Sequence, residues 1–148
     1  MHLSVINGPN LNLLGSREPE IYGSDSLEEI EQLVASRAAE LGVAVSWCQS
    51  NHEGGVVEAI QESASADGMI LNAAALTHTS ISVRDALLAV RVPFVEVHLS
   101  NIFSREPERR KSLTADIAIG IVAGFGARSY VLGLDAIVGY LRQRASTG

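Results

Sequence analysis

The chain has 148 residues, a formal charge of −6 and 47% hydrophobic residues. This length predicts a single domain over residues 1–148, and the apolar content excludes a disordered tail or a fibrous repeat. The negative charge argues against a nucleic-acid partner, because general binding to a phosphate backbone needs clustered cations.

Lysine and cysteine are each present once, as Lys111 and Cys48. A lysine Schiff base is therefore possible at one position only, in a charged loop without an evident apolar pocket to activate the amine. A single cysteine allows no intrachain disulfide, which fits a reducing cytoplasm. The first residues lack the pattern of a signal peptide, and no apolar run reaches the roughly 18 residues of a membrane span. We therefore expect a cytoplasmic protein with no membrane partner.

The predicted elements alternate between strands and helices. An apolar block at residues 2–6 predicts a strand that ends in the turn-forming residues 7–10, and residues 16–24 are expected to form a polar loop. Ser26 and Glu29 have the spacing of a capping box, and apolar residues recur at helical spacing from there to Gly42, so a helix is predicted over residues 27–41. Further strands are predicted at residues 43–49, 69–72, 94–98 and 117–123, and further helices at residues 56–65, 80–90 and 127–144. A long polar loop is expected over residues 99–114.

The strands are rich in Val and Ile without strict alternation, which is typical of strands buried on both faces. This order of elements predicts an α/β fold with a parallel sheet, joined by right-handed crossovers and covered by helices on both sides.

Polar residues gather where the predicted strands end. Three of the four histidines follow or end a strand, and so do most of the asparagines. Ligands of open α/β sheets bind beyond the carboxyl ends of the strands, so we predict a polar pocket for a hydroxylated molecule at this edge. The alternative is that these are ordinary loop residues. Glu96 and His98 are expected to face opposite sides of their strand, so no metal site is predicted from them.

Five segments of the chain follow one another in a specific order: NGPNLNLLG at residues 7–15 with REP at 17–19 and YG at 22–23, QSNHEG at 49–54, LTHTS at 76–80, RDA at 84–86, and EVHLSN at 96–101. Together they resemble the type II 3-dehydroquinate dehydratases, over nearly the whole chain. The resemblance implies a flavodoxin-like three-layer sandwich with a five-stranded parallel sheet of strand order 2-1-3-4-5, assembled as a homo-oligomeric dodecamer of four trimers. It also implies an anti elimination of water from 3-dehydroquinate that gives 3-dehydroshikimate, with no cofactor and no metal.

By this resemblance the catalytic residues are Tyr22 as proton acceptor, Arg17 as transition-state stabiliser, His98 as proton donor, Asn10 as holder of a water near the enolate oxygen, and Glu96, which orients or tunes the acid. A guanidinium beside Tyr22 would favour the tyrosinate, and the loop that carries both would close as a lid. The substrate-binding residues implied are Asn72, His78, Asp85, Leu99, Ser100 and Arg109, with Asp85 reached from a neighbouring subunit. Arg105 matches a further family position near the lid.

Each of these residues also has a simpler interpretation. Tyr22 could be a loop aromatic that packs on the core, His98 a hydrogen-bonded strand-end histidine, and Asp85 a carboxylate on a helix surface. The chain departs from the family at Glu108 and over residues 110–116, which leaves substrate affinity and assembly open. Two other functions remain: the same reaction in quinate catabolism rather than in the shikimate pathway of aromatic amino acid biosynthesis, and a non-catalytic flavodoxin-like binding module.

Overall fold

The computed structural model describes residues 1–16 and 18–148 and contains one five-stranded sheet. All of the strand pairs are parallel, and the strands lie in the order β2-β1-β3-β4-β5, so the predicted fold class is confirmed. The strands are β1 (His2–Asn7), β2 (Ala44–Gln49), β3 (Gly68–Asn72), β4 (Phe94–His98) and β5 (Gly120–Ala123). The α-helices are α1 (Pro19–Tyr22), α2 (Leu27–Leu41), α3 (Glu53–Glu62), α4 (Ile81–Val90) and α5 (Arg128–Thr147).

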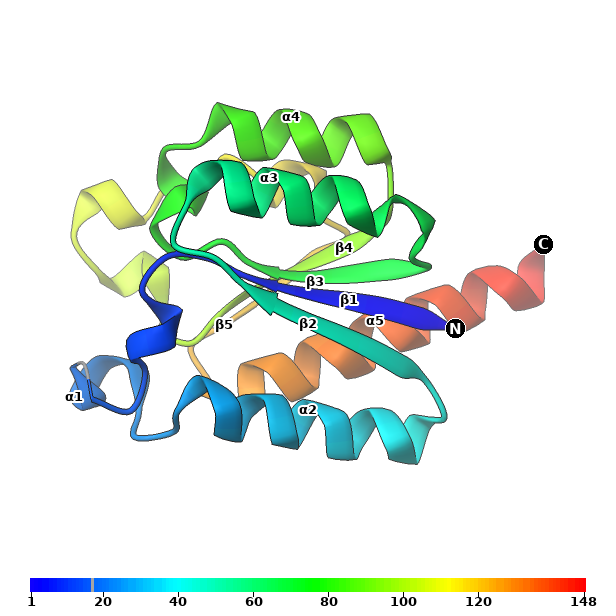
Figure 1. Cartoon of the computed structure of the whole chain (residues 1–148), viewed down its shortest axis with the longest axis horizontal. Helices are drawn as coiled ribbons and strands as arrows, with labels where there is room; N and C mark the ends of the chain where they lie inside the picture. The colour runs from blue at the N-terminus through cyan, green and yellow to red at the C-terminus, as the bar shows by residue number, and fades with distance from the viewer. Residues whose placement is uncertain (17) are drawn as a thin grey trace.

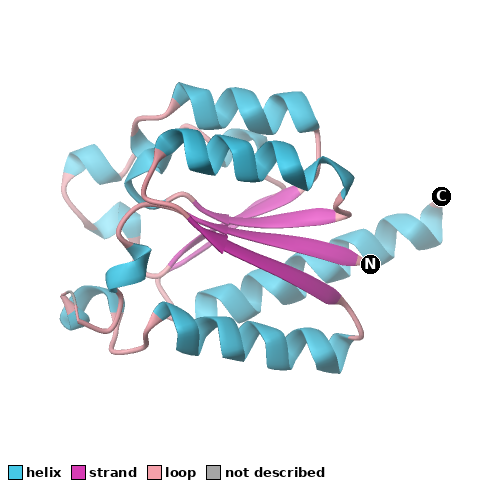
Figure 2. Ribbon diagram, in the orientation of Figure 1, coloured by secondary structure: helices cyan, strands magenta, loops and turns pink. Residues whose placement is uncertain are grey.

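The helices cover the sheet as two layers (Figure 1). Helices α3 and α4 lie on one face, and α2 and α5 lie on the other, as Figure 2 also shows. The strands all point toward the end of the molecule that carries α1, and the two chain termini lie at the opposite end. None of the helices within the described residues is long and apolar enough to span a membrane.

The predicted ends of α2 are confirmed. The Ser26 hydroxyl accepts a hydrogen bond from the Glu29 backbone N–H at 3.1 Å, and Gly42 ends the helix with a φ of 69°. Both features satisfy backbone groups that would otherwise lack partners at a helix terminus.

Several element boundaries differ from the prediction. Helix α3 begins at Glu53 rather than at residue 56, since the Val56 N–H already bonds the His52 carbonyl at 3.1 Å. The two glycines in this first turn interrupt the helical spacing of apolar residues, so the sequence pattern did not reveal it. The strand predicted from residue 117 begins only at Gly120, since Ile117 N–H turns back to the Thr114 carbonyl. The expected loop at residues 16–24 contains the one-turn helix α1, and residues 99–114 contain two short 3-10 helices.

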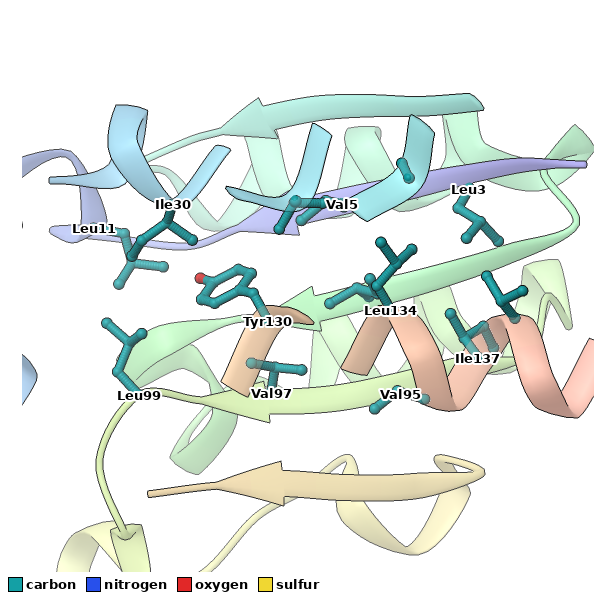
Figure 3. Close-up of a cluster of buried hydrophobic side chains, with 14 of the residues drawn as sticks. Leu3, Val5, Leu11, Ile30, Val95, Val97, Leu99, Tyr130, Leu134 and Ile137 are labelled. Carbon is teal, nitrogen blue, oxygen red and sulfur yellow. The ribbon is translucent and has the colours of Figure 1, made fainter. Parts of the chain in front are cut away.

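Alternate residues of the central strands supply two apolar cores, one on each face. The core under α2 and α5 includes Leu3, Val5 and Val97, and part of it is drawn in Figure 3. The core under α3 and α4 includes Ile6 and Leu71. Both cores anchor β1, β3 and β4, and these strands therefore hold the loops at their carboxyl ends in fixed positions.

Candidate active site

A cavity of about 120 Å³ lies beyond the carboxyl ends of β1, β3 and β4. Strands β1 and β3 are the pair at which the strand order reverses, and this is where ligands of open α/β sheets bind. The residues of the cavity wall that were singled out from the sequence are Asn10, Tyr22, Asn72, His78, His98, Leu99, Ser100, Arg105 and Arg109. The sequence prediction of a polar pocket at this edge thus agrees with the geometry.

Among the predicted site residues that the structure describes, two do not line this cavity. Glu96 is buried behind His98, and Asp85 is exposed on α4. Arg17 lies outside the described residues.

Tyr22, at the end of α1, is paired with an arginine from the opposite half of the sequence. Arg105 donates a hydrogen bond from Nη1 to the Tyr22 hydroxyl at 2.9 Å, and its guanidinium carbon lies 5.3 Å from the centre of the tyrosine ring. A guanidinium in this position stabilises a phenolate more than a neutral phenol. The sequence assigned Arg17 to this task and placed Arg105 only near the lid. The 83 positions between Tyr22 and Arg105 explain why no local pattern could pair them.

The expectation that Glu96 and His98 face opposite ways is wrong. His98 Nε2 lies 3.0 Å from Glu96 Oε2, and both residues are almost fully buried. Side chains alternate along a strand, so residues two positions apart share a face. Because a carboxylate accepts, the proton of this hydrogen bond lies on His98 Nε2.

The Glu96 carboxylate is held by further hydroxyl groups. Its other oxygen accepts hydrogen bonds from Ser112 at 2.9 Å and from Thr114. Burial alone would raise the pKa of Glu96, but the hydrogen bonds from His98, Thr114 and Ser112 outweigh it and hold that pKa below its ordinary value. Glu96 is therefore an ionised group in contact with a histidine that lines the cavity.

The asparagines of the cavity are fixed by neighbouring groups. Asn72, at the end of β3, accepts a hydrogen bond from Ala74 N–H at 3.1 Å and donates to the Tyr130 hydroxyl at 2.8 Å. Asn10 adopts a left-handed backbone with a φ of 69°, and its N–H donates to Asn51 Oδ1 at 2.9 Å. Asparagine tolerates this backbone better than most residues, which explains its use in the turn after β1.

The remaining polar groups approach from the loops after β3 and β4. His78 Nδ1 donates to the Lys111 carbonyl at 2.7 Å. Arg109 donates to the Glu106 carboxylate, which also lies 3.8 Å from Arg105. Glu106 thus connects the two arginines of the cavity, a role that the sequence prediction missed.

The described residues of the cavity contain no lysine. Lys111 is exposed outside it, as the sequence analysis favoured. In the part of the chain that the structure describes, no three His, Cys, Asp or Glu side chains form a group that could hold a metal ion.

The fold and the cavity together define a class of protein: an α/β enzyme of flavodoxin-like fold, whose cavity is lined by a carboxylate-bound histidine and an arginine-bound tyrosine. The family profile described as Dehydroquinase class II matches residues 1–138. The chain belongs to this family, so the resemblance inferred from the sequence is confirmed, and with it the prediction of a dehydrating enzyme.

Individual relatives agree over nearly the full length. The 3-dehydroquinate dehydratase of Prochlorococcus marinus (strain NATL1A) is 56% identical over 144 residues, which cover 97% of this chain and 99% of that protein. That of Trichodesmium erythraeum (strain IMS101) is 52% identical over 144 residues, covering 97% of this chain and 96% of the relative. The crystal structure of a type II dehydroquinase from Butyrivibrio crossotus superposes with a TM-score of 0.91 at 38% identity, covering 93% of this chain and 97% of that one.

Proposed function

We propose that this chain removes water from 3-dehydroquinate to give 3-dehydroshikimate, as the names of its relatives indicate for them. The observation that carries the proposal is that an arginine-bound tyrosine and a carboxylate-bound histidine line one cavity. Loss of a proton next to a ketone needs a base and a group that stabilises the enolate, and loss of a hydroxide needs an acid.

Tyr22 acts as the base. A free tyrosine is mostly protonated at neutral pH, and the contact with the Arg105 guanidinium favours the phenolate that can take the proton. Arg17 stabilises the transition state from the same segment, and closure of residues 16–24 over the cavity excludes water.

His98 acts as the acid. Its Nε2–H donates to the Glu96 carboxylate, so the proton given to the departing hydroxide comes from Nδ1 of the imidazolium. The ionised carboxylate stabilises that imidazolium, and this is how Glu96 tunes the acid without touching the substrate.

The other residues of the cavity bind the substrate and the enolate. Asn10 holds a water near the enolate oxygen as it gains charge. The substrate contacts proposed from the cavity wall are Asn72, His78, Leu99, Ser100 and Arg109. No metal or cofactor takes part in this proposal.

We further propose that the chain assembles as a dodecamer of four trimers in the cytoplasm. Edge strand β5 and the residues on either side of it expose Ile119, Ile121 and Phe125, a surface that association would cover. In the trimer, the exposed Asp85 would reach the cavity of a neighbouring subunit. Light scattering at micromolar concentration tests the assembly, and a monomeric mass would contradict it.

The activity is tested by the absorbance of the conjugated enone product, with purified protein and 3-dehydroquinate between about pH 6 and pH 9. Absence of product over this range, with ligand still bound, would support the binding-module alternative, which the altered loop at residues 108–116 motivates. Whether the reaction serves the shikimate pathway or quinate catabolism is tested separately, by whether deletion of the gene causes a requirement for aromatic amino acids or loss of growth on quinate.

A further inference from the structure

A chain of hydrogen bonds runs from β2 to the cavity through one buried hydroxyl group. Asn7 donates to the Cys48 carbonyl at 2.9 Å, and its amide oxygen accepts from the Tyr130 hydroxyl at 2.7 Å. That hydroxyl in turn accepts from Asn72 Nδ2 at 2.8 Å, and Asn72 Oδ1 accepts from Ala74 N–H at 3.1 Å. The chain thus joins three strands and α5 directly behind the wall of the cavity.

The direction of every hydrogen bond in this chain is fixed by its two ends. A backbone carbonyl can only accept, so the nitrogen of Asn7 must face Cys48 and its oxygen must face Tyr130. A backbone N–H can only donate, so the oxygen of Asn72 must face Ala74 and its nitrogen must face Tyr130. The Tyr130 hydroxyl therefore donates its proton to Asn7 Oδ1 and accepts a hydrogen bond from Asn72 Nδ2.

Tyr130 is well suited to hold this arrangement. Its side chain is fully buried in the core under α2 and α5, where the hydroxyl points toward the end of the sheet at which Leu11 and Leu99 lie (Figure 3). Trp47 packs against it with ring centres 5.8 Å apart. Burial raises the pKa of Tyr130, so the hydroxyl keeps its proton throughout the working pH range.

We propose that Tyr130 is a positioning residue for ligand binding: together with the Ala74 N–H, it holds the Asn72 amide so that this side chain offers the cavity an N–H donor. Of the two amide N–H groups, one is used by Tyr130, and within the described residues no protein group uses the other. The second N–H would bind a ligand group that accepts a hydrogen bond, such as a hydroxyl or carbonyl oxygen of a cyclic polyol acid. This inference rests on the proposed role of Asn72 as a substrate contact.

The first test is Tyr130→Phe, which keeps the ring and removes only the hydroxyl. The Asn72 amide is then held by the Ala74 N–H alone, and its nitrogen loses the hydroxyl that fixes its position. We therefore expect KM for 3-dehydroquinate to rise about 3- to 10-fold, while kcat stays within about twofold of the parent value. Tyr140→Phe is the matched control, because Tyr140 lies on the same helix away from the cavity, and its KM should not change. An unchanged KM in Tyr130→Phe overturns the proposal, whatever happens to the melting temperature.

A second variant keeps the proposal testable if Tyr130→Phe does not fold. Asn7 does not line the cavity, but its amide oxygen accepts the hydrogen bond from the Tyr130 hydroxyl. Asn7→Ala removes that acceptor, so the Tyr130 hydroxyl can turn and no longer holds Asn72 Nδ2 in a fixed position. KM should then rise by a similar factor. A KM equal to that of the parent contradicts the proposal.

The double variants separate this inference from the proposed function. If Tyr130 acts through Asn72, then adding Tyr130→Phe to Asn72→Ala should leave KM unchanged. If the two substitutions instead raise KM independently, so that their fold-changes multiply, Tyr130 does not act through Asn72. A raised KM in Asn72→Ala with an unchanged KM in Tyr130→Phe overturns only the role of Tyr130. An unchanged KM in Asn72→Ala overturns the ligand contact itself, and this inference with it.

Discussion

Arg105 and Tyr22 meet at 2.9 Å across 83 positions of sequence, which makes Arg105 a cation in direct contact with the proposed base. The guanidinium also lies over the tyrosine ring, so the pair is held by a hydrogen bond and by a cation–π contact. The proposed chemistry therefore depends on the loop after β4 as much as on the segment that carries Tyr22.

Replacing Arg105 by methionine should lower kcat/KM by about 10- to 100-fold, because the phenolate loses a charge-assisted hydrogen bond. Arg105→Lys should recover part of this loss, since it restores the charge without the planar fork. The measurement is steady-state formation of the enone product. Arg144→Met is the matched control, because Arg144 lies over the Tyr140 ring far from the cavity, and it should have parental activity. Full activity of Arg105→Met would contradict the pairing.

Tyr22→Phe should reduce kcat by about 100- to 10,000-fold, the usual contribution of a general base. The folded state should be little affected, because the side chain is only half-buried. Thermal unfolding and kcat are measured on the same sample, with Tyr140→Phe as the control. Retained turnover would exclude Tyr22 as the base.

Thr114→Val should destabilise the protein more at neutral pH than in acid. The folded-state pKa of Glu96 lies below its ordinary value of 4.5, so the stabilisation is complete above that value and disappears as the pH falls through the folded-state pKa. Loss of the Thr114 hydrogen bond raises the folded-state pKa. The variant should therefore lose about 1 to 3 kcal/mol at neutral pH, and the difference should shrink below about pH 4.

The pH dependence of the melting temperature between about pH 3 and pH 7 measures this effect. Thr147→Val, at the exposed end of α5, is the control and should follow the parent curve. If the difference in melting temperature between Thr114→Val and the parent stays constant with pH, the substitution has removed only packing and not a hydrogen bond to ionised Glu96.

Gly8→Ala should damage the cavity through the backbone. A Cβ atom at Gly8 would overlap the carbonyl group of Ala73, and the Gly8 N–H bonds the Asn72 carbonyl at 2.8 Å. We expect a loss of about 1 to 3 kcal/mol in stability, together with a raised KM as Asn72 is displaced. Gly139→Ala is the control: nothing lies within 4 Å of the added Cβ, and it should be neutral or stabilising. Denaturant unfolding and KM are measured on both variants, and parental values for Gly8→Ala would contradict the close approach.

Local patterns in the sequence were sufficient for most of the fold. Helix α2 and its two caps depend on contacts three to five residues apart, and the buried parallel strands depend on their uninterrupted Val and Ile. The polar residues that end β1, β3 and β4 were also recognisable, because parallel strands bring their carboxyl ends to one edge. Even the contact of Glu96 with His98 follows from the alternation of side chains along a strand, although the opposite was expected.

The tertiary structure alone decided which partners these residues have. Arg105 reaches Tyr22, Ser112 and Thr114 reach Glu96, and Tyr130 reaches both Asn7 and Asn72. These partners are 16 to 123 positions apart, and they come from loops and from a helix whose placement is set by packing on the sheet. Helical spacing and strand alternation act over a few residues, so they determine where each element lies along the chain. The charge and orientation of the side chains in the cavity are set by contacts between elements, which exist only once the chain has folded.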